Sequence, residues 1–255
     1  MSRSIQARST LILGALAALS FALATVLIQS KAGDAQALAA SRELAAIAEA
    51  QAGRVQRLAE SPLLMSRALA ASTRAEILSG TPSRQRIVEV VRQHALSDPS
   101  ALGYWIEFER DGFDGLDASS PADASLGVTD SGRLSIYWVR DASGAVSLED
   151  STGTENDTNL DEEAYYAAAR TRGAEMMFEP YLYTVFDREV LMTSLMVPIL
   201  VDGQHRGVAG ADVTLEGMQR ALGEVRPFET GVLRLFSPSG KVMAAPETVL
   251  LGKDW

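Results

Sequence analysis

The chain has 255 residues, of which 47% are hydrophobic and 22% are charged, a composition typical of folded globular proteins rather than of disordered ones. Its 23 Lys and Arg residues against 33 Asp and Glu residues give a net charge of −10, and this acidic balance argues against a nucleic-acid partner. Cysteine is absent, which excludes disulfides, thiolate metal sites and a cysteine nucleophile.

The first segment of the chain is uncharged from residue 9 to residue 30, between Arg8 and Lys31. About 20 apolar residues cross a hydrocarbon core of about 30 Å, so the pattern predicts a transmembrane helix at 9–31. A cleavable signal peptide is the alternative, but its apolar core is shorter and 28–31 is a poor cleavage site. Because Arg3 and Arg8 come first, the positive-inside rule keeps residues 1–8 cytoplasmic and exports the remainder.

Residues 32–96 are rich in Ala, Arg, Glu and Leu, and this composition predicts stalk helices. Ser61 and Pro62 form a cap-and-first-turn pattern that predicts a restart of the helix and a bend. A second break at 80–82 precedes a helix that starts at Ser83. One narrow apolar stripe runs along the stalk, at Leu44, Ile47, Val55 and Leu58.

From residue 98 onward the pattern changes to strands, because apolar residues alternate and turn residues separate the runs. The pair Asp202-Gly203 predicts a tight hairpin. Antiparallel strands that follow helices predict an α+β fold. The expected strands lie at 102–109, 134–139, 145–148, 190–197, 206–213, 231–236 and 241–244, and the expected short helices at 161–170 and 215–222.

Four fragments occur along the chain in a fixed order: Leu-Ala-Glu-Ser-Pro at 58–62, Phe-Glu-Pro-Tyr at 178–181, Leu-Met-Thr-Ser at 191–194 and Gly-Val-Ala-Gly-Ala-Asp-Val at 207–213. Behind an apolar first segment, this set resembles the double Cache (dCache) sensor region of bacterial methyl-accepting chemotaxis receptors over about 10–255. The resemblance implies a membrane-distal, PAS-like Cache lobe at 97–222 that binds a ligand. It also implies the start of a membrane-proximal PAS-like lobe at 223–255, so we expect the chain to be truncated in that second lobe.

The same resemblance points to a ligand site. The amino-acid-binding branch of the family carries Arg-x-Trp-Tyr in a helix and then Tyr-x-Asp. Here the first run is 163–166, Glu-Ala-Tyr-Tyr, so an acid stands where the arginine would pair a ligand carboxylate. Asp212 matches the aspartate that holds the ligand's ammonium group. An acid among aromatic rings favours a cation, and we therefore expect a ligand site made of Asp212, Tyr166, Tyr165, Tyr183, Tyr181 and Trp138.

Other roles for these residues are open. Aromatic side chains in strands usually pack, which is the expected role of Tyr104 and Trp105 and an alternative for Trp138. Asp212 is alternatively the N-cap of the next helix, a role for which Thr214 competes. The acid-rich run at 149–163 is expected to be a solvated loop. The two histidines lack partners at ligand spacing and no cofactor motif occurs, so we expect neither a metal site nor a cofactor.

These expectations describe the sensing part of a transmembrane chemoreceptor, which binds an amine, a betaine-like molecule or an amino acid. The same sensor region is also used by histidine kinases and diguanylate cyclases, which is the alternative. A membrane-anchored periplasmic hydrolase is a distant alternative, since no nucleophile–base pair is found, and we do not expect an enzyme. The expected setting is the cell inner membrane, contacted through 9–31, with a periplasmic sensor that forms a homodimer through its stalk.

Overall fold

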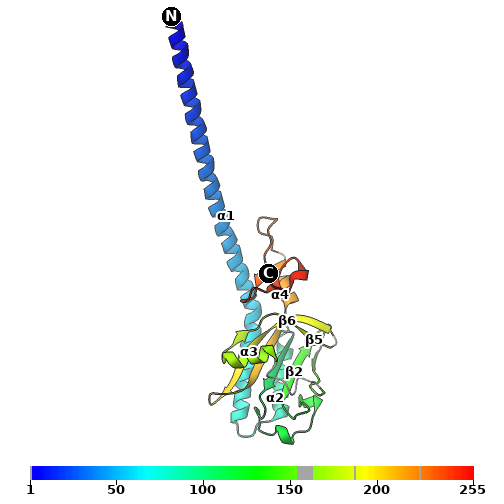
Figure 1. The fold of residues 1–255 in the computed structure, drawn as a ribbon. Helices are drawn as coiled ribbons and strands as arrows, with labels where there is room; N and C mark the ends of the chain where they lie inside the picture. Colours follow the sequence, from blue (N-terminus) through cyan, green and yellow to red (C-terminus); the bar gives the residue numbers. More distant parts are fainter. Residues whose placement is uncertain (1, 154–162, 187, 224) are drawn as a thin grey trace. The chain divides into compact units, whose positions relative to one another are not determined.

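The computed structural model describes residues 2–153, 163–186, 188–223 and 225–255, with the side chains of 2–15, 17, 18 and 221 left outside the description. The chain divides into two compact units, Met1–Ala50 and Gln51–Trp255. Helix α1 (Ser2–Leu78) makes up the whole described part of the first unit and continues into the second (Figure 1). Each unit is described by itself below.

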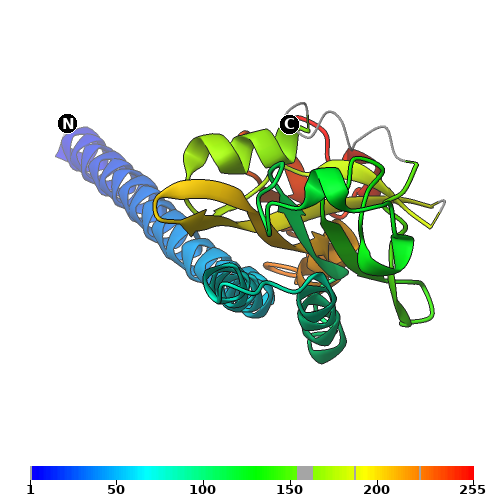
Figure 2. The same cartoon turned by 90° about the horizontal axis from the view of Figure 1, so that it is seen from below.

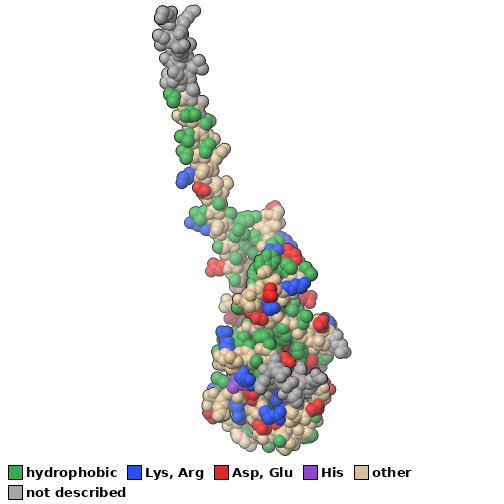
Figure 3. All heavy atoms as spheres, in the orientation of Figure 1, with side chains coloured by type: hydrophobic (Ala, Val, Ile, Leu, Met, Phe, Trp, Pro, Cys, Tyr) green, Lys and Arg blue, Asp and Glu red, His purple; other side chains and the backbone are tan. Residues whose placement is uncertain are grey.

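The helix of the first unit exposes apolar side chains, which cluster directly after the grey residues at the start of the helix (Figure 3). Leu19, Phe21 and Ile28 are 71%, 77% and 68% exposed. The transmembrane helix predicted at 9–31 is helical, although the side chains of 9–15 lie outside the described ones. Among the helices that the structure describes, none combines the length and the hydropathy that a membrane crossing requires.

Helix α1 does not restart at Ser61 and Pro62, which corrects the break predicted there. Pro62 lies inside the helix, and Ser66, one turn later, donates its hydroxyl to the Pro62 carbonyl at 2.8 Å. Ser61 is not a cap, because its hydroxyl donates to the Asp98 carboxylate at 3.0 Å. A long-range partner for the serine therefore replaces the local one that a cap would need.

Helix α2 (Arg84–Ser97) begins where the sequence predicts, after the break at 80–82. The Ser83 hydroxyl accepts a hydrogen bond from the Arg86 amide at 3.3 Å, which is an N-cap contact. One face of the helix is buried against the sheet, and this face consists of Ile87, Val88, Val91 and Ala95.

The second unit is built on an antiparallel seven-stranded sheet in the order β3-β2-β1-β7-β6-β4, with β5 also paired to β6. The expected hairpin at Asp202 and Gly203 joins the two longest strands, with φ of +51° and +77°. The α+β class is thus confirmed. The strands are β1 (Gly103–Phe108), β2 (Ser135–Arg140), β3 (Val146–Leu148), β4 (Met176–Met177), β5 (Tyr181–Val185), β6 (Arg188–Val201) and β7 (Gln204–Thr214).

The sheet has two covered faces, because successive side chains of a strand point to opposite sides. On β1, Tyr104, Ile106 and Phe108 pack against α2 and the last turns of α1. Trp105 packs on the other side, where α3 (Ala164–Arg172) covers the sheet. Figure 2 shows α2 and α3 on opposite sides of the strands. The cavity described below lies on the α3 side.

A smaller region follows the sheet, with α4 (Leu215–Gly223) and the strand pair β8 (Leu235–Phe236) and β9 (Val242–Ala244). It packs on the sheet through a third apolar cluster, which we call the junction cluster. This cluster joins strands β6 and β7 to α4, β9 and helix α1, and its members are Leu195, Val213, Met218 and Met243 with Ala59, Leu63, Met177 and Leu235. The 3₁₀ helices are η1 (Asp117–Ser119), η2 (Ala124–Leu126) and η5 (Thr248–Leu250).

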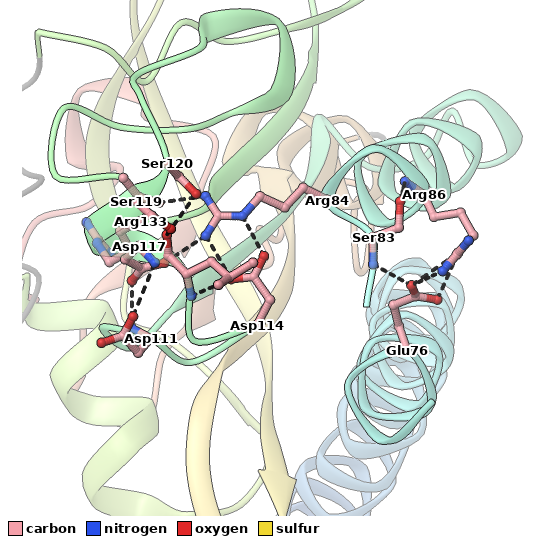
Figure 4. A network of polar contacts seen from close by, with 12 residues as sticks. Glu76, Ser83, Arg84, Arg86, Asp111, Asp114, Asp117, Ser119, Ser120 and Arg133 are labelled. Carbon is pink, nitrogen blue, oxygen red and sulfur yellow. Dashed lines mark hydrogen bonds and ion pairs between the residues drawn. The ribbon is translucent and has the colours of Figure 1, made fainter. Parts of the chain in front are cut away.

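A buried ion-pair network, which we call the tip network, fixes the start of α2 to the loop after β1 (Figure 4). The Arg84 guanidinium donates twice to Asp114, at 2.8 Å each, and once to Asp117 at 2.9 Å. It also donates to the Gly132 carbonyl at 2.6 Å. Gly132 has a φ of +80°, and an added Cβ would collide with the Asp117 backbone, so only glycine fits there.

Candidate functional site

A pocket of about 530 Å³ lies on the α3 side of the sheet. Its walls come from β1, β2, the residues after β3, the start of α3, β5 and β7, so segments far apart in the sequence meet there. The aromatic and ionisable side chains that line the pocket are Trp105, Glu107, Arg133, Tyr137, Glu149, Asp150, Glu163, Tyr165, Tyr181, Tyr183 and Asp212.

Trp105 reaches the pocket because a glycine stands opposite it on the neighbouring strand. Trp105 is paired with Gly210 in the β1–β7 register, and an added Cβ at Gly210 would lie 2.3 Å from the indole ring. The glycine therefore leaves room for the ring to lie across β7. The indole Nε1 then donates a hydrogen bond to Asp212 at 3.1 Å.

Asp212 is the most deeply buried acid of the pocket, at 3% exposed. Its Oδ1 accepts hydrogen bonds from the Ser194 hydroxyl at 2.6 Å and from Trp105. Tyr181 extends this chain, with its hydroxyl 2.7 Å from that of Ser194. Burial raises the pKa of Asp212, and the hydrogen bonds from Ser194 and Trp105 oppose the shift. Thr214, whose hydroxyl accepts from the Gly217 amide at 3.2 Å, occupies the helix-start position, which leaves Asp212 free of a capping role.

Glu149 is a second pocket acid, and its partly buried side chain corrects the expectation of a fully solvated loop at 149–163. The Tyr183 hydroxyl donates to its Oε2 at 3.1 Å. Burial raises the pKa of Glu149 to about 7, Tyr183 opposes that shift, and the negative charges of Asp212 and Glu107 add to it. Residues 154–162 lie outside the described structure, but the sequence has no basic residue from 149 to 163.

Aromatic rings line the walls around these acids. Tyr165 stacks on Tyr181 with ring centroids 6.0 Å apart and planes 12° apart, and it meets Trp105 edge-on at 5.6 Å. Tyr137 meets Tyr183 edge-on at 6.1 Å. The Tyr137 hydroxyl is buried and lacks a hydrogen bond of normal geometry, and burial followed by the nearby charge of Asp212 raises its pKa. The pocket therefore combines ring faces with carboxylates.

Arg133 is the one basic side chain among the pocket residues, and its charge is already opposed. Its guanidinium lies 3.3 Å from the Glu107 carboxylate and donates to the Phe108 carbonyl at 3.2 Å. Ser135 donates to the other oxygen of Glu107 at 2.7 Å. The remaining carboxylates thus leave the described pocket acidic, which suits a cationic ligand rather than an anionic one. Across the described ranges, no three acid or histidine side chains converge in the manner of metal ligands.

The structure brings four of the six predicted site residues into the pocket, namely Asp212, Tyr165, Tyr181 and Tyr183. Tyr166 lies outside the pocket lining, because its hydroxyl donates to Glu109 at 2.9 Å. The same Glu109 contacts His205 at 3.2 Å, and chiefly this contact lowers the pKa of Glu109 to about 2. Trp138 packs on the α2 side of the sheet, with the Arg92 guanidinium 5.6 Å from its ring centre.

Sequence reasoning missed Trp105, Tyr137 and Glu149. The signal for the two rings was strand alternation: Trp105 and Tyr137 are directly paired across β1 and β2, so both share one face, and Trp138 belongs to the other. Glu149 carried no signal, because its position within a run of acids resembled an ordinary exposed loop.

No protein-family model matches the chain. Among curated proteins it is similar to the methyl-accepting chemotaxis protein TlpQ of Pseudomonas aeruginosa, with 31% identity over 182 residues, which are 67% of this chain and 25% of that protein. It is 27% identical over 90 residues to the methyl-accepting chemotaxis protein PscA of Pseudomonas syringae pv. tomato, which covers 35% of this chain and 14% of PscA. The chain therefore spans a quarter or less of the curated relatives it matches.

Among solved structures, the fold is similar to that of Methyl-accepting Chemotaxis protein X, with a TM-score of 0.64 and 25% identity over 84% of this chain and 79% of the other. The extracellular domain of mmHK1S-Z3, described as a histidine kinase, gives a TM-score of 0.64 and 26% identity over 79% and 69%. The ligand-binding domain of PctB from Pseudomonas aeruginosa, solved with L-Arg, shares the fold at a TM-score of 0.55 and 17% identity over 81% and 70%. The homologues of this chain are methyl-accepting chemotaxis proteins, and its structural neighbours are the sensory Cache domains of chemoreceptors and histidine kinases.

Proposed function

We propose that this chain is the extracytoplasmic ligand-sensing region of a chemoreceptor, and that its pocket binds a small cationic amine. The carrying observation is a pair of pocket carboxylates, Asp212 and Glu149, that have aromatic walls around them and no basic partner within the described structure. A cation satisfies both acids and gains cation–π attraction of about 0.5–2 kcal/mol from each ring face that it contacts.

Arg133 supports this choice over a ligand with its own carboxylate. A betaine or an amino acid needs a guanidinium for its carboxylate, and the arginine at hand is opposed by Glu107. An amine has no such need, so the proposed order of preference is an amine first, a betaine-like molecule next, and an amino acid last.

An amino acid is the second candidate, and a specific observation favours it. Two of the structural neighbours are chemoreceptor domains solved with amino acids, Tlp3 of Campylobacter jejuni with isoleucine and PctB with L-Arg. In that reading Asp212 holds the ammonium group and Arg133 turns from Glu107 to the ligand carboxylate.

Calorimetric titration of the purified full chain separates the candidates. The panel contains choline, ethanolamine, 1,4-diaminobutane, glycine betaine, L-isoleucine and L-arginine at one pH and ionic strength. Saturable heat from at least one of the three amines, and weaker or no heat from L-isoleucine, is the expected result. Heat from L-isoleucine alone would replace the amine by an amino acid, and silence across the panel would remove both.

The setting and the output belong to the proposal as well. The uncharged run at 9–30 supports a membrane anchor, and Arg3 and Arg8 before it support a cytoplasmic N-terminus. Carbonate extraction of membranes tests the anchor, in cells that express either the full chain or a chain lacking 2–31. Retention of only the longer chain in the membrane is expected. The domain boundaries at 31/32, 96/97 and 222/223, the homodimer and the histidine kinase or diguanylate cyclase output stay predictions. The reading frame downstream of Trp255 distinguishes the outputs.

A further inference from the structure

Glu149 is a partly buried acid that has no cationic partner among the described residues. Its carboxylate has one hydrogen bond from Tyr183, at 3.1 Å, and lies in the same pocket as Asp212 and Glu107. Like charges that share a partly buried space destabilise one another, so the ionisation of Glu149 is disfavoured while no cation is present.

The groups that face Glu149 come from each element around the pocket. The acids are Glu107 on β1, Asp212 on β7, Glu163 before α3 and the adjacent Asp150. Tyr137, Tyr165 and Tyr183 have buried phenols with raised pKa values, so they stay neutral through the physiological range. Arg133, the basic group, lies against Glu107. Apart from Arg133, which is paired with Glu107, the described groups that line the pocket with Glu149 are therefore acidic or neutral.

We propose that a cationic amine in the pocket is bound by Glu149 as well as by Asp212, and that its arrival drives a proton from the Glu149 carboxyl into solvent, so that occupancy rises with pH through the neutral range. This rests on the proposed amine-binding function. The exchange is balanced: a neutral carboxyl and a free cation become a carboxylate–cation pair and one proton accepted by the buffer. Glu149 is in this sense a specificity-determining residue, because a neutral ligand cannot displace its proton.

The pKa of Glu149, about 7, sets the size of the effect. Binding near pH 6 then releases close to one proton per ligand, and binding near pH 8 releases almost none. The affinity for a cation of fixed charge rises about tenfold between pH 6 and pH 8, because the ionised fraction of the Glu149 carboxyl in the free protein rises by about that factor.

The test has a ligand-free arm and a ligand arm, both on the full chain. In the first, NMR of ¹³C-carboxyl-labelled glutamate follows Glu149, assigned by its loss in Glu149→Gln, and a midpoint near 7 is expected. Tyr183→Phe removes the bond that stabilises the ionised form, so its midpoint moves upward by about half a unit to one unit. A midpoint near the ordinary value of about 4.3 overturns the inference whatever the ligand is.

In the second arm, choline and 1,4-diaminobutane are titrated at pH 6 and pH 8 in two buffers of different ionisation enthalpy, which counts the protons released. Both probes keep their charge over this range. Proton release at pH 6 that disappears in Glu149→Gln is expected. Asp141→Asn is the matched control, because Asp141 is an exposed acid outside the pocket lining that accepts its hydrogen bonds from Ser143, so the variant should keep the release.

The outcomes are separable. A midpoint near 7 with amine binding but no proton release overturns the coupling and leaves the amine-binding proposal standing. A midpoint near 7 with no binding of either probe or of ethanolamine removes the amine-binding proposal, and the coupling falls with it.

Discussion

Two groups of buried acids in this molecule differ in what the chain provides for them. In the tip network, Arg84 pairs with Asp114 and Asp117 at 2.8 and 2.9 Å, and the contact with Arg84 lowers the pKa of Asp114. In the pocket, burial raises the pKa of both Asp212 and Glu149, and the hydrogen-bond donors around them are neutral hydroxyl and indole groups.

The comparison concerns whether the chain supplies a cation to its buried carboxylates. In the tip network, Arg84 of α2 supplies a guanidinium to the acids, because an isolated buried charge is strongly destabilising. In the pocket, the described residues give Asp212 and Glu149 no such cation, and the proposed amine would bring the positive charge. Even so, burial outweighs the partners of Asp117, whose pKa is raised, so the contrast concerns cation supply rather than burial.

The largest expected effect comes from Asp212→Asn. This change keeps the shape and an oxygen acceptor for Ser194 but removes the charge, so amine affinity is expected to fall by about 100-fold or more. Calorimetry with the best-binding amine of the panel measures it, and Asp114→Asn should leave the same affinity unchanged. Equal losses from the two variants would erase the distinction between the pocket and the tip network.

Asp114→Asn tests the other half of the comparison. It leaves Arg84 with a weaker partner inside a network where the Arg84 side chain is 11% exposed and that of Asp114 is 6% exposed. We expect the free energy of unfolding to drop by about 3 kcal/mol, measured by denaturant unfolding of the full chain. Asp212→Asn is expected to cost far less, since it removes a buried charge that lacks a cation. A larger loss of stability from Asp212→Asn would show that the pocket acids are structural too.

Glu149→Gln links stability to pH. The folded pKa of Glu149 lies near 7, above the ordinary unfolded value of about 4.3, so the folded state holds the proton longer and the wild-type chain loses stability as pH rises from 4 to 8. The glutamine variant lacks this loss. It should match the wild type at pH 4 and exceed it by about 1–2 kcal/mol at pH 8 without ligand, in thermal unfolding at both values. A variant that is less stable at pH 8 would contradict the assignment.

The smallest effect is expected from Trp138→Phe. Trp138 faces α2 and Arg92 rather than the pocket, so amine affinity should stay within about twofold of the wild type, while unfolding becomes easier by about 1 kcal/mol through lost packing. The same titrations measure it. A tenfold loss of amine affinity would show that Trp138 contributes to ligand binding.

The sequence predicted the strands well because alternation is a strong local signal. It chose the wrong ring on β2, however: Trp138 was selected and Tyr137 lines the pocket, a one-residue error that moves a side chain to the other face. The strands at Met176–Met177 and Tyr181–Val185 were both missed, and the first of them has two residues, too few to carry a periodicity. Pro62 was interpreted as a break, yet Ser61 has a partner in Asp98, which sequence alone does not reveal.

The junction cluster has one further consequence. Ser194 and Asp212 are directly paired on β6 and β7, and the next residue on each strand, Leu195 and Val213, belongs to that cluster with Ala59 and Leu63 of α1. The pocket side of β6 and β7 and the surface on which α1 packs are thus the two faces of the same strand pair. A hydrogen-bonded ladder is stiff, so we expect a rearrangement around Asp212 to reach α1 across a single strand pair rather than along a chain of flexible segments.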